Sequence, residues 1–230
     1  MEILEVKNIS KSFDKKKIID DVSFTISEGQ IVGLLGKNSS GKTTILKMIN
    51  DLLTIDSGEI LVDGKKIGAK TKAEISFLPE RSYLDNTMTV EQTLKFFKEF
   101  YKDFDKARAE KLLGELQISK SDYLSKMSKG GKEKLQLVLV MSRNAKLYIL
   151  DEPLGGVDPS TRDYILKTII SRFSEKSCML ITTHLVADIE GILDRVMFLD
   201  KGKIVLNEDT EKLRAETGLS VDELFRRDLK

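Results

Sequence analysis

The stretch "LLGKNSSGKTTILKM", residues Leu34–Met48, places two glycines around a polar turn. A continuous apolar run ends just before the turn, and apolar residues recur with helical spacing after it. The sequence therefore predicts a buried strand, a glycine loop and a helix in direct succession. Glycines let a backbone wrap closely around an anion, because no Cβ stands in the way. The N–H groups of such a loop and of the first helical turn point at the bound anion.

The residues from Gly36 to Thr43 fit the pattern G-x-x-x-x-G-K-[ST], which is typical of loops that hold nucleoside triphosphates. Lys42 would place a positive charge on the outer phosphates, and the Thr43 hydroxyl would bind Mg²⁺. A glycine turn with a chance lysine is the alternative, but the preceding strand and the following helix favour phosphate binding. Kinases, GTPases and ATPases all remain open at this point. The residues expected at the nucleotide are Gly36, Lys37, Asn38, Ser39, Ser40, Gly41, Lys42, Thr43 and Thr44.

Two adjacent acids end another apolar run, "LYILDEP" (Leu147–Pro153). A carboxylate that leaves a sheet beside the phosphate loop can hold Mg²⁺, directly or through water, and we assign this role to Asp151. Glu152 would face the other way if the strand geometry persists, and it would orient or deprotonate the attacking water. Two solvated acids at a strand end are the alternative. The apolar run before the acids and Pro153 after them favour a shaped site, and an acid pair favours hydrolysis over transfer to a bound acceptor.

The composition excludes several classes of partner and location. The chain has 230 residues, of which 40% are hydrophobic, and 38 basic residues against 37 acidic ones leave a net charge of +1. We therefore expect no binding to nucleic acid, because no strong overall field attracts it. Cys178 is the single cysteine, so the chain cannot form an internal disulfide and a reducing compartment is expected. Neither a signal peptide nor an apolar stretch of membrane-spanning length is present.

Strand patterns and helix patterns alternate in both halves of the chain. "VSFTI" (Val22–Ile26) alternates strictly, as a half-buried strand does, and Lys201-Gly202 separates two apolar runs in the manner of a hairpin. Between the halves lies a segment with helical patterns only. Capping boxes predict that helices begin just after Thr89 and Ser220. The sequence thus predicts an α/β fold with a mostly parallel sheet and an inserted helical subdomain, in one domain.

A second glycine stretch, "MSKGGKEKLQL" (Met127–Leu137), places small residues ahead of another expected helix. It can be a second anion cradle or an ordinary glycine turn that caps a helix, and taken alone it favours neither. One ATP has one triphosphate, which the first loop already wraps. Two cradles on one chain are useful if each serves a different ATP, as in two chains paired head to tail.

With these three stretches in this order, the chain resembles the nucleotide-binding subunit of ABC transporters over nearly its whole length. That family carries a signature written L-S-G-G-Q, whose place is occupied here by Met127 to Gly131. Ser128 and Gly130 match the signature, whereas Met127, Lys129 and Gly131 depart from it. The resemblance implies that Ser128 and Gly130 contact ATP bound by a second subunit, and Lys129 resembles the residue of an export-like subgroup.

The same resemblance implies roles for residues elsewhere in the chain. Phe13 stands where an aromatic side chain stacks on adenine, although a strand aromatic packed in the core is a rival interpretation. Glu80 replaces the usual glutamine that senses Mg²⁺ and links to the membrane partner. Asp158 lies in the loop that crosses the dimer interface, and His184 matches the histidine that contacts the γ-phosphate and holds the water. Ser39 replaces the glycine usual in the phosphate loop, which would shift the backbone slightly.

The resemblance implies an ATPase that uses ATP and Mg²⁺, with Glu152, His184 and Lys42 as catalytic residues and Thr43, Glu80 and Asp151 near the metal. It implies a P-loop NTPase fold of the ABC type with antiparallel N-terminal strands. The implied function is to power transport, in an export-like (ABC-2-type) bacterial subgroup. The domain boundaries expected within 1–230 are a core at about 1–80 and 140–206, a helical subdomain at about 81–139 and a tail at 207–230.

The resemblance also implies partners. A second ATPase subunit, identical or related, would complete the site, and a membrane-spanning permease subunit would hold the chain at the cytoplasmic, inner face of the cell membrane. An aromatic cluster in the helical segment is the candidate docking face for that permease. Its members are Phe96, Phe97, Phe100 and Tyr101.

Three other classes of protein stay open. Soluble ABC ATPases of DNA repair resemble this core, but they carry long coiled coils between the phosphate loop and the signature. The segment from Gly41 to Ser128 is too short for such an arm and lacks sustained heptads. Translation-associated ATPases of this type have two such domains in one chain. A nucleotide kinase is a more distant rival, which the Asp151-Glu152 pair disfavours.

Overall fold

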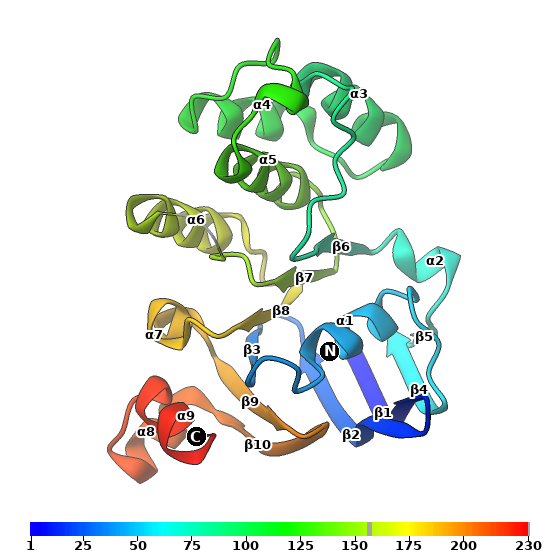
Figure 1. Cartoon of the computed structure of the whole chain (residues 1–230), viewed down its shortest axis with the longest axis vertical. Coiled ribbons are helices and arrows are strands. Elements are labelled where there is room, and N and C mark those ends of the chain that lie inside the picture. Colours follow the sequence, from blue (N-terminus) through cyan, green and yellow to red (C-terminus); the bar gives the residue numbers. More distant parts are fainter. Residues whose placement is uncertain (156–157, 230) are drawn as a thin grey trace.

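Two β-sheets and a group of helices make up the molecule (Figure 1), and the computed structural model describes residues 1–155 and 158–229. The smaller sheet is antiparallel, in the order β2-β1-β4-β5. The larger sheet has the order β10-β9-β3-β8-β7-β6 and is parallel except for the β9–β10 pair. The strands are β1 (Glu2–Phe13), β2 (Lys16–Ser27), β3 (Ile31–Leu35), β4 (Ser57–Val62), β5 (Lys65–Lys66), β6 (Ile75–Leu78), β7 (Leu147–Asp151), β8 (Cys178–Thr183), β9 (Arg195–Asp200) and β10 (Lys203–Asp209).

Three strands in the middle of the larger sheet set the position of the site. In the register of these strands, Leu35 of β3 lies opposite Thr183 of β8, and Asp151 of β7 lies opposite Thr182. All residues of β3, β7 and β8 are buried, as in parallel strands covered on both faces. The carboxyl ends of these strands therefore meet at one edge, where ligands bind in open α/β sheets.

The helices cover the sheets and form a separate group at one end of the molecule, where α3, α4 and α5 lie together (Figure 1). Capping boxes begin α3 and α9 as predicted, with Thr89–Gln92 and Ser220–Glu223 each bonded reciprocally. The helices are α1 (Lys42–Ile49), α2 (Ala69–Lys72), α3 (Val90–Phe100), α4 (Lys106–Glu115), α5 (Lys129–Met141), α6 (Pro159–Arg172), α7 (Val186–Ile189), α8 (Thr210–Thr217) and α9 (Val221–Asp228), with 3₁₀ turns η1 (Leu124–Lys126) and η2 (Glu190–Ile192).

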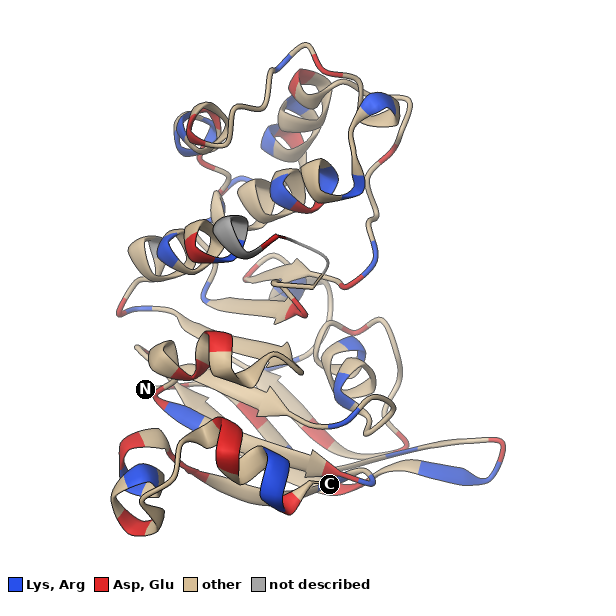
Figure 2. Ribbon diagram, turned by 60° about the vertical axis from the view of Figure 1, so that its left-hand side comes forward, with Lys and Arg blue, Asp and Glu red and all other residues tan. Residues whose placement is uncertain are grey.

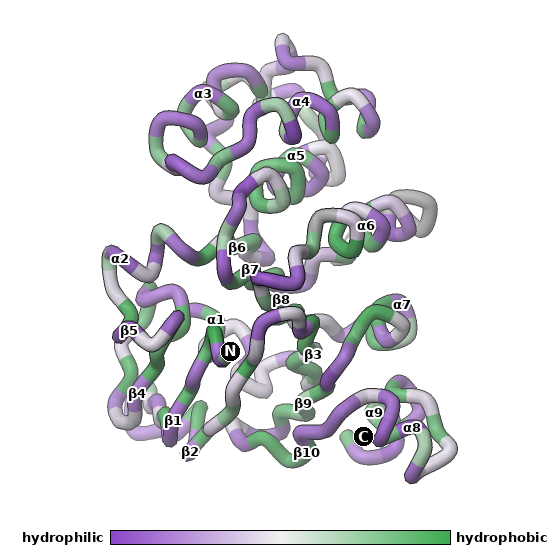
Figure 3. The backbone as a smooth tube through the Cα atoms, turned by 180° about the vertical axis from the view of Figure 1, so that it is seen from behind, coloured by the Kyte–Doolittle hydropathy of each residue, from purple (hydrophilic) through white to green (hydrophobic). Residues whose placement is uncertain are grey.

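The buried apolar residues fall into three clusters, one on each face of the larger sheet and one in the helical group. Ile149 and its neighbour Leu150 belong to opposite faces, because side chains alternate along a strand. Helix α5 belongs to two clusters, since Leu135 packs in the helical group and Leu137 packs against the sheet. The apolar segments of the strands and of α5 are green in Figure 3.

Most predicted elements are confirmed, and the first strand is longer than the sequence pattern shows. The alternation in Val22–Ile26 is confirmed, and Lys201-Gly202 forms the predicted hairpin with φ values of 46° and 79°. The pattern predicts a strand at Ile3–Val6, whereas β1 runs to Phe13. Register shifts interrupt its pairing with β2, so the apolar alternation is broken although the strand continues.

Charged residues of both signs are interspersed over the ribbon (Figure 2), in agreement with the net charge of +1. Within residues 1–155 and 158–229, no helix combines the length and the apolar character needed to cross a bilayer.

Candidate nucleotide-binding site

The loop between β3 and α1 has the backbone that its glycines allow. Gly41 has a φ of 113°, and a Cβ there would lie 2.5 Å from the Ile19 side chain. A Cβ on Gly36 would lie 2.5 Å from the carbonyl oxygen of Leu199. The loop thus packs directly on its neighbours, and glycine is required at both positions. Ser39 has a φ of 66°, so this serine holds a left-handed conformation that glycine adopts at lower cost.

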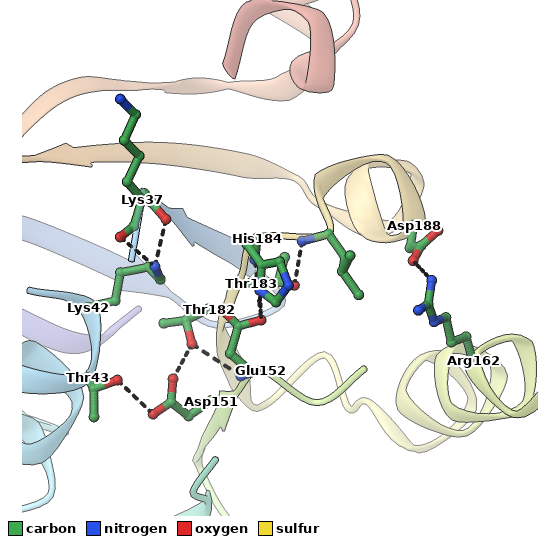
Figure 4. Close-up of polar contacts among 12 residues, drawn as sticks. Lys37, Lys42, Thr43, Asp151, Glu152, Arg162, Thr182, Thr183, His184 and Asp188 are labelled. Atoms are coloured by element: carbon green, nitrogen blue, oxygen red, sulfur yellow. Dashed lines mark hydrogen bonds and ion pairs between the residues drawn. The ribbon is translucent and has the colours of Figure 1, made fainter. Parts of the chain in front are cut away.

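The Lys42 ammonium lies inside the curve of the loop (Figure 4). Its Nζ donates to the carbonyl oxygens of Gly36 at 2.6 Å and Lys37 at 3.1 Å. Burial lowers the pKa of Lys42, and Glu152, Asp151 and Glu80 act in the opposite direction through their charges. A cationic lysine beside the loop N–H groups gives this loop the electrostatics of a phosphate site.

Asp151 ends β7 in an almost fully buried position, with 2% of its surface exposed. Thr43 Oγ1 donates to its Oδ2 at 3.1 Å, and Thr182 Oγ1 donates to its Oδ1 at 2.6 Å. Burial raises the pKa of Asp151, whereas the two hydroxyl bonds lower it and the charges of Glu80 and Glu152 raise it further. A bound cation would offset the cost of burying this carboxylate.

The donor chemistry at Asp151 fits Mg²⁺. The Thr43 hydroxyl and the Asp151 carboxylate supply hard oxygen ligands within hydrogen-bonding distance of each other. No cluster of three or more His, Cys, Asp or Glu residues in the described part of the chain is arranged to hold a metal, so a cation at this site would have few protein ligands. Mg²⁺ commonly takes one or two protein oxygens and completes its coordination with substrate phosphates and water. The two residues present are therefore enough for such a site.

Glu152 turns away from the strand instead of continuing it. Its φ is 52°, and its N–H donates to the Thr182 carbonyl oxygen at 3.0 Å. Its Oε2 lies 2.9 Å from His184 Nδ1, and the His184 N–H donates to the same oxygen at 3.3 Å (Figure 4). The strand geometry thus does not persist at Glu152, and its carboxylate is directed to His184 at the end of β8.

A cavity of 960 Å³ brings most of the predicted site residues together. Phe13 lines it with 44% of its surface exposed, so the interpretation of Phe13 as a core residue is wrong. The predicted residues in the lining are Phe13, Asn38, Ser39, Gly41, Lys42, Thr43, Thr44, Glu80, Asp151, Glu152 and His184. Gly36, Lys37 and Ser40 lie in the same loop but not in this lining, and the first two contact Lys42 instead.

The signature-like segment begins α5 earlier than the sequence predicts. Ser128 is the N-cap, and its Oγ accepts a hydrogen bond from the Gly131 N–H at 3.1 Å. Gly130 and Gly131 therefore lie in the first turn rather than ahead of the helix. Neither Ser128 nor Gly130 lines the cavity of its own chain.

Two lysines at the start of α5, Lys129 and Lys132, line the cavity. The sequence leads us to expect that Lys129 alone among the lysines there is near nucleotide, and that the others are a solvated helix start. In the structure, Lys132 lines the cavity together with Lys129 and Glu133, so two lysines of α5 face it where the sequence leads us to expect one. Lys132 Nζ donates to the Asn86 side chain at 2.6 Å, and this contact holds it in place.

The remaining predicted residue, Asp158, has an exposed side chain, and its carbonyl oxygen accepts the Arg162 N–H at 3.1 Å. Gly156 and Val157 of the same predicted loop lie outside the described residues. An ion pair of 2.8 Å between Arg162 and Asp188 joins α6 to α7, which begins two residues after His184 (Figure 4).

The sequence analysis missed Thr182. This residue is fully buried, and it contacts both Asp151 and Glu152. Two consecutive threonines at the end of an otherwise largely apolar strand, in "CMLITTH", are the signal that marks it in the sequence. A hydroxyl in such a strand needs a partner, and the partner here is a site carboxylate.

Replacing Gly41 with alanine should weaken ATP binding by about 10-fold or more, because the new Cβ meets Ile19 and the positive φ becomes strained. Gly64→Ala is the matched control, since Gly64 also has a positive φ of 68° but has open space around its Cβ position. Equilibrium titration with a fluorescent ATP analogue measures both variants. Equal affinities for the two variants would contradict the close packing of the loop.

Comparison with known proteins places these features in a family. Residues 19–155 match the family model described as ABC transporter. The chain is 34% identical to the ABC transporter ATP-binding protein YtrB of Bacillus subtilis, over 93% of this chain and 74% of that protein. It is 32% identical to the lipopolysaccharide export system ATP-binding protein LptB of Haemophilus influenzae, over 93% of each chain.

Structural comparison agrees with the sequence matches. A solved ATP-binding subunit of an ABC transporter superposes with a TM-score of 0.90 and 28% identity, over 98% of both chains. The predicted fold class and the predicted resemblance are both confirmed. The chain belongs to the ABC transporter family, as a subunit that binds and hydrolyses ATP.

Proposed function

We propose that the 960 Å³ cavity holds Mg²⁺·ATP and that Glu152 and His184 carry out its hydrolysis there. The contact of 2.9 Å between the Glu152 carboxylate and His184 supports this proposal most strongly. It joins two polar side chains at the ends of neighbouring strands, on the wall of the cavity that Lys42 and Asp151 also line.

In this proposal, the phosphate loop supplies most of the charge stabilisation. Lys42 and the loop N–H groups spread the negative charge that develops when water attacks the γ-phosphate in line. Thr43 and Asp151 would hold Mg²⁺, which neutralises phosphate charge when bound. Glu80 lies on the same wall and adds a carboxylate near that position. Phe13 offers an exposed ring on which adenine stacks.

Glu152 is the general base in this proposal. Its carboxylate would accept the proton of the attacking water, which is a step worth about 10²–10⁴-fold in rate for a well-placed base. His184 holds the Glu152 carboxylate through its Nδ1 and leaves the rest of its ring, which is half exposed, facing the cavity. The ring is therefore placed to orient the water and the γ-phosphate.

A second subunit would complete the site. Ser128 is exposed at the start of α5, outside the cavity of its own chain. A head-to-tail pair would bring Ser128 and Gly130 of each subunit, with the N–H groups of the α5 N-terminus, to the ATP of the other subunit. Asp158 would lie at the same interface.

A groove of 760 Å³ on another side of Asp151 is the proposed contact with a membrane-spanning permease. Apolar and aromatic side chains, including Phe97 and Tyr101, line it together with Arg143. The Arg143 guanidinium lies 3.9 Å from the centre of the Tyr101 ring. Because Glu80 and Asp151 line both the groove and the cavity, a permease segment in the groove would reach the wall of the ATP site.

Two phenylalanines extend this proposed surface on α3. Phe96 and Phe100 are 50% and 67% exposed, and their rings stack at 5.9 Å. With a permease on this side, the chain would work in the cytoplasm at the inner face of the cell membrane. We propose export as the direction of transport, because the similar protein LptB is the ATP-binding protein of a lipopolysaccharide export system. The matches to transport ATPases favour this reading over DNA repair or translation.

Replacing both Phe96 and Phe100 with aspartate should remove permease binding and leave basal ATP turnover unchanged, because the two rings are exposed and outside the cavity. The measurement is recovery of a multi-span membrane protein with the tagged chain from detergent-solubilised membranes. Val205→Asp is the control, since Val205 is 57% exposed on β10, at the opposite end of the molecule from α3 (Figure 1). Undiminished recovery with the double variant would reject this surface, and turnover stimulated by DNA with no membrane partner would reject the transport proposal.

A further inference from the structure

One hydroxyl at the end of β8 contacts both residues of the acid pair (Figure 4). Thr182 Oγ1 donates to Asp151 Oδ1 at 2.6 Å and accepts from the Glu152 N–H at 3.3 Å. The Thr182 carbonyl oxygen accepts from the same N–H at 3.0 Å. A threonine hydroxyl has one proton and two lone pairs, so it can make both side-chain contacts at once.

The bond from Thr182 to Asp151 fixes which oxygen of the Asp151 carboxylate faces Thr43 and the proposed Mg²⁺ position. With Oδ1 engaged by Thr182, the other oxygen, Oδ2, is the one that lies 3.1 Å from the Thr43 hydroxyl. The two bonds thus fix the rotation of the Asp151 carboxylate. Burial alone would not do so, because it does not distinguish one carboxylate oxygen from the other. The orientation suits the proposed Mg²⁺ position between Thr43 and Asp151.

The bonds to Glu152 act on its backbone. Glu152 holds a φ of 52°, a conformation that costs a non-glycine residue about 1–3 kcal/mol unless its surroundings impose it. Thr182 supplies two acceptors for its N–H, one from the side chain and one from the main chain. From this conformation the Glu152 carboxylate reaches His184, which lies two residues beyond Thr182.

We propose that Thr182 is a positioning residue for ATP hydrolysis, which orients Asp151 toward Mg²⁺ and holds Glu152 in the conformation that meets His184. This inference rests on the proposed function of the cavity. A valine has nearly the same shape and would suit the buried strand as well. The hydroxyl, rather than the volume, is therefore the part of Thr182 that serves the site.

The experiment compares Thr182→Val, which removes the hydroxyl, with Thr182→Ser, which keeps it. In the full chain, Thr182→Val should lower kcat and the apparent Mg²⁺ affinity by about 10–100-fold each, as substitutions behind metal ligands do. Binding of a fluorescent ATP analogue without Mg²⁺ should not change. Thr182→Ser should stay within about threefold of the wild-type values.

Thr93→Val is the structural control, because Thr93 is also a buried threonine with a hydrogen-bonded hydroxyl. Its Oγ1 donates to the carbonyl oxygen of Thr89, the N-cap of α3, outside the lining of the cavity. It should lower the melting temperature without changing kcat or the Mg²⁺ dependence. If Thr182→Val is too unstable to purify, Thr182→Ala takes its place with the same expected results.

Wild-type kcat and Mg²⁺ dependence in the variants without the hydroxyl would overturn the proposal. So would an equal loss of ATP binding with and without Mg²⁺, since a general structural defect produces that pattern. The proposed function is tested separately by Glu152→Gln. A hydrolysis-dead Glu152→Gln beside a fully active Thr182→Val would reject the role of Thr182 alone, and an active Glu152→Gln would reject the proposed function of the cavity.

Discussion

Replacing Glu152 with glutamine should reduce ATP turnover by about 10²–10⁴-fold and leave ATP binding intact. Glutamine keeps the length of the side chain and an oxygen that can face His184 Nδ1, so the contact of 2.9 Å can be retained. It removes the group that accepts the proton of the attacking water. Steady-state phosphate release and equilibrium binding of ATP measure the two quantities separately.

The same variant should accumulate as an ATP-bound dimer, because the nucleotide that would hold the two subunits of the proposed pair together is no longer cleaved. Size-exclusion chromatography with and without ATP would detect the change in mass. Glu216→Gln is the matched control, since Glu216 is an exposed carboxylate on α8 and should give wild-type turnover. Turnover of Glu152→Gln near the wild-type level would remove Glu152 from the role of base.

Replacing Ser128 with arginine should reduce turnover to the level of an isolated subunit and leave ATP affinity unchanged. Ser128 is exposed and outside the cavity of its own chain, so a large cation there does not touch the ATP bound by that chain. It would collide with the phosphate loop of a second subunit in the proposed pair. Turnover measured over a range of protein concentrations shows the effect, because pairing makes the wild-type rate rise more steeply than the concentration.

The N-cap role of Ser128 requires a control of its own. Its Oγ accepts the Gly131 N–H at 3.1 Å, and losing such a cap costs about 1 kcal/mol of helix stability. Ser128→Ala loses the cap and the proposed hydroxyl contact with the second ATP but adds no bulk, so its turnover should be lower than that of the wild type and higher than that of Ser128→Arg. Equal turnover in the wild type and in Ser128→Arg would show that no second subunit closes over this position.

The phosphate loop and the strand ends could be predicted from the sequence because their geometry is local. Gly36 to Thr43 form one continuous segment. Residues at the ends of buried parallel strands, such as Asp151 and His184, meet at one edge of the sheet whatever the conformation of the loops that connect the strands. The same reasoning predicts the capping boxes at α3 and α9, which depend on four consecutive residues each.

Other features depend on a single dihedral angle or on packing between distant segments. The positive φ of Glu152 turns its carboxylate to His184, and no residue pattern at the strand end indicates where that strand stops. Lys132 reaches the cavity because α5 begins at Lys129 and because its own side chain is hydrogen-bonded to Asn86, in the loop before α3. The bond from Thr182 to Asp151 joins two residues that are 31 positions apart in the chain and lie on neighbouring strands.

Helix α5 has a mechanical consequence, because its residues are divided between two apolar clusters. Its 13 residues make a rigid arm about 20 Å long, with Met141 packed against the sheet and Lys129 at the other end, next to the helical group. A tilt of roughly 10° about the Met141 end would carry the tip about 3 Å, which is the length of a hydrogen bond. In the proposed assembly, a small movement that the permease imposes on α3 would therefore make or break contacts between the tip of α5 and the phosphate oxygens of the second subunit's ATP.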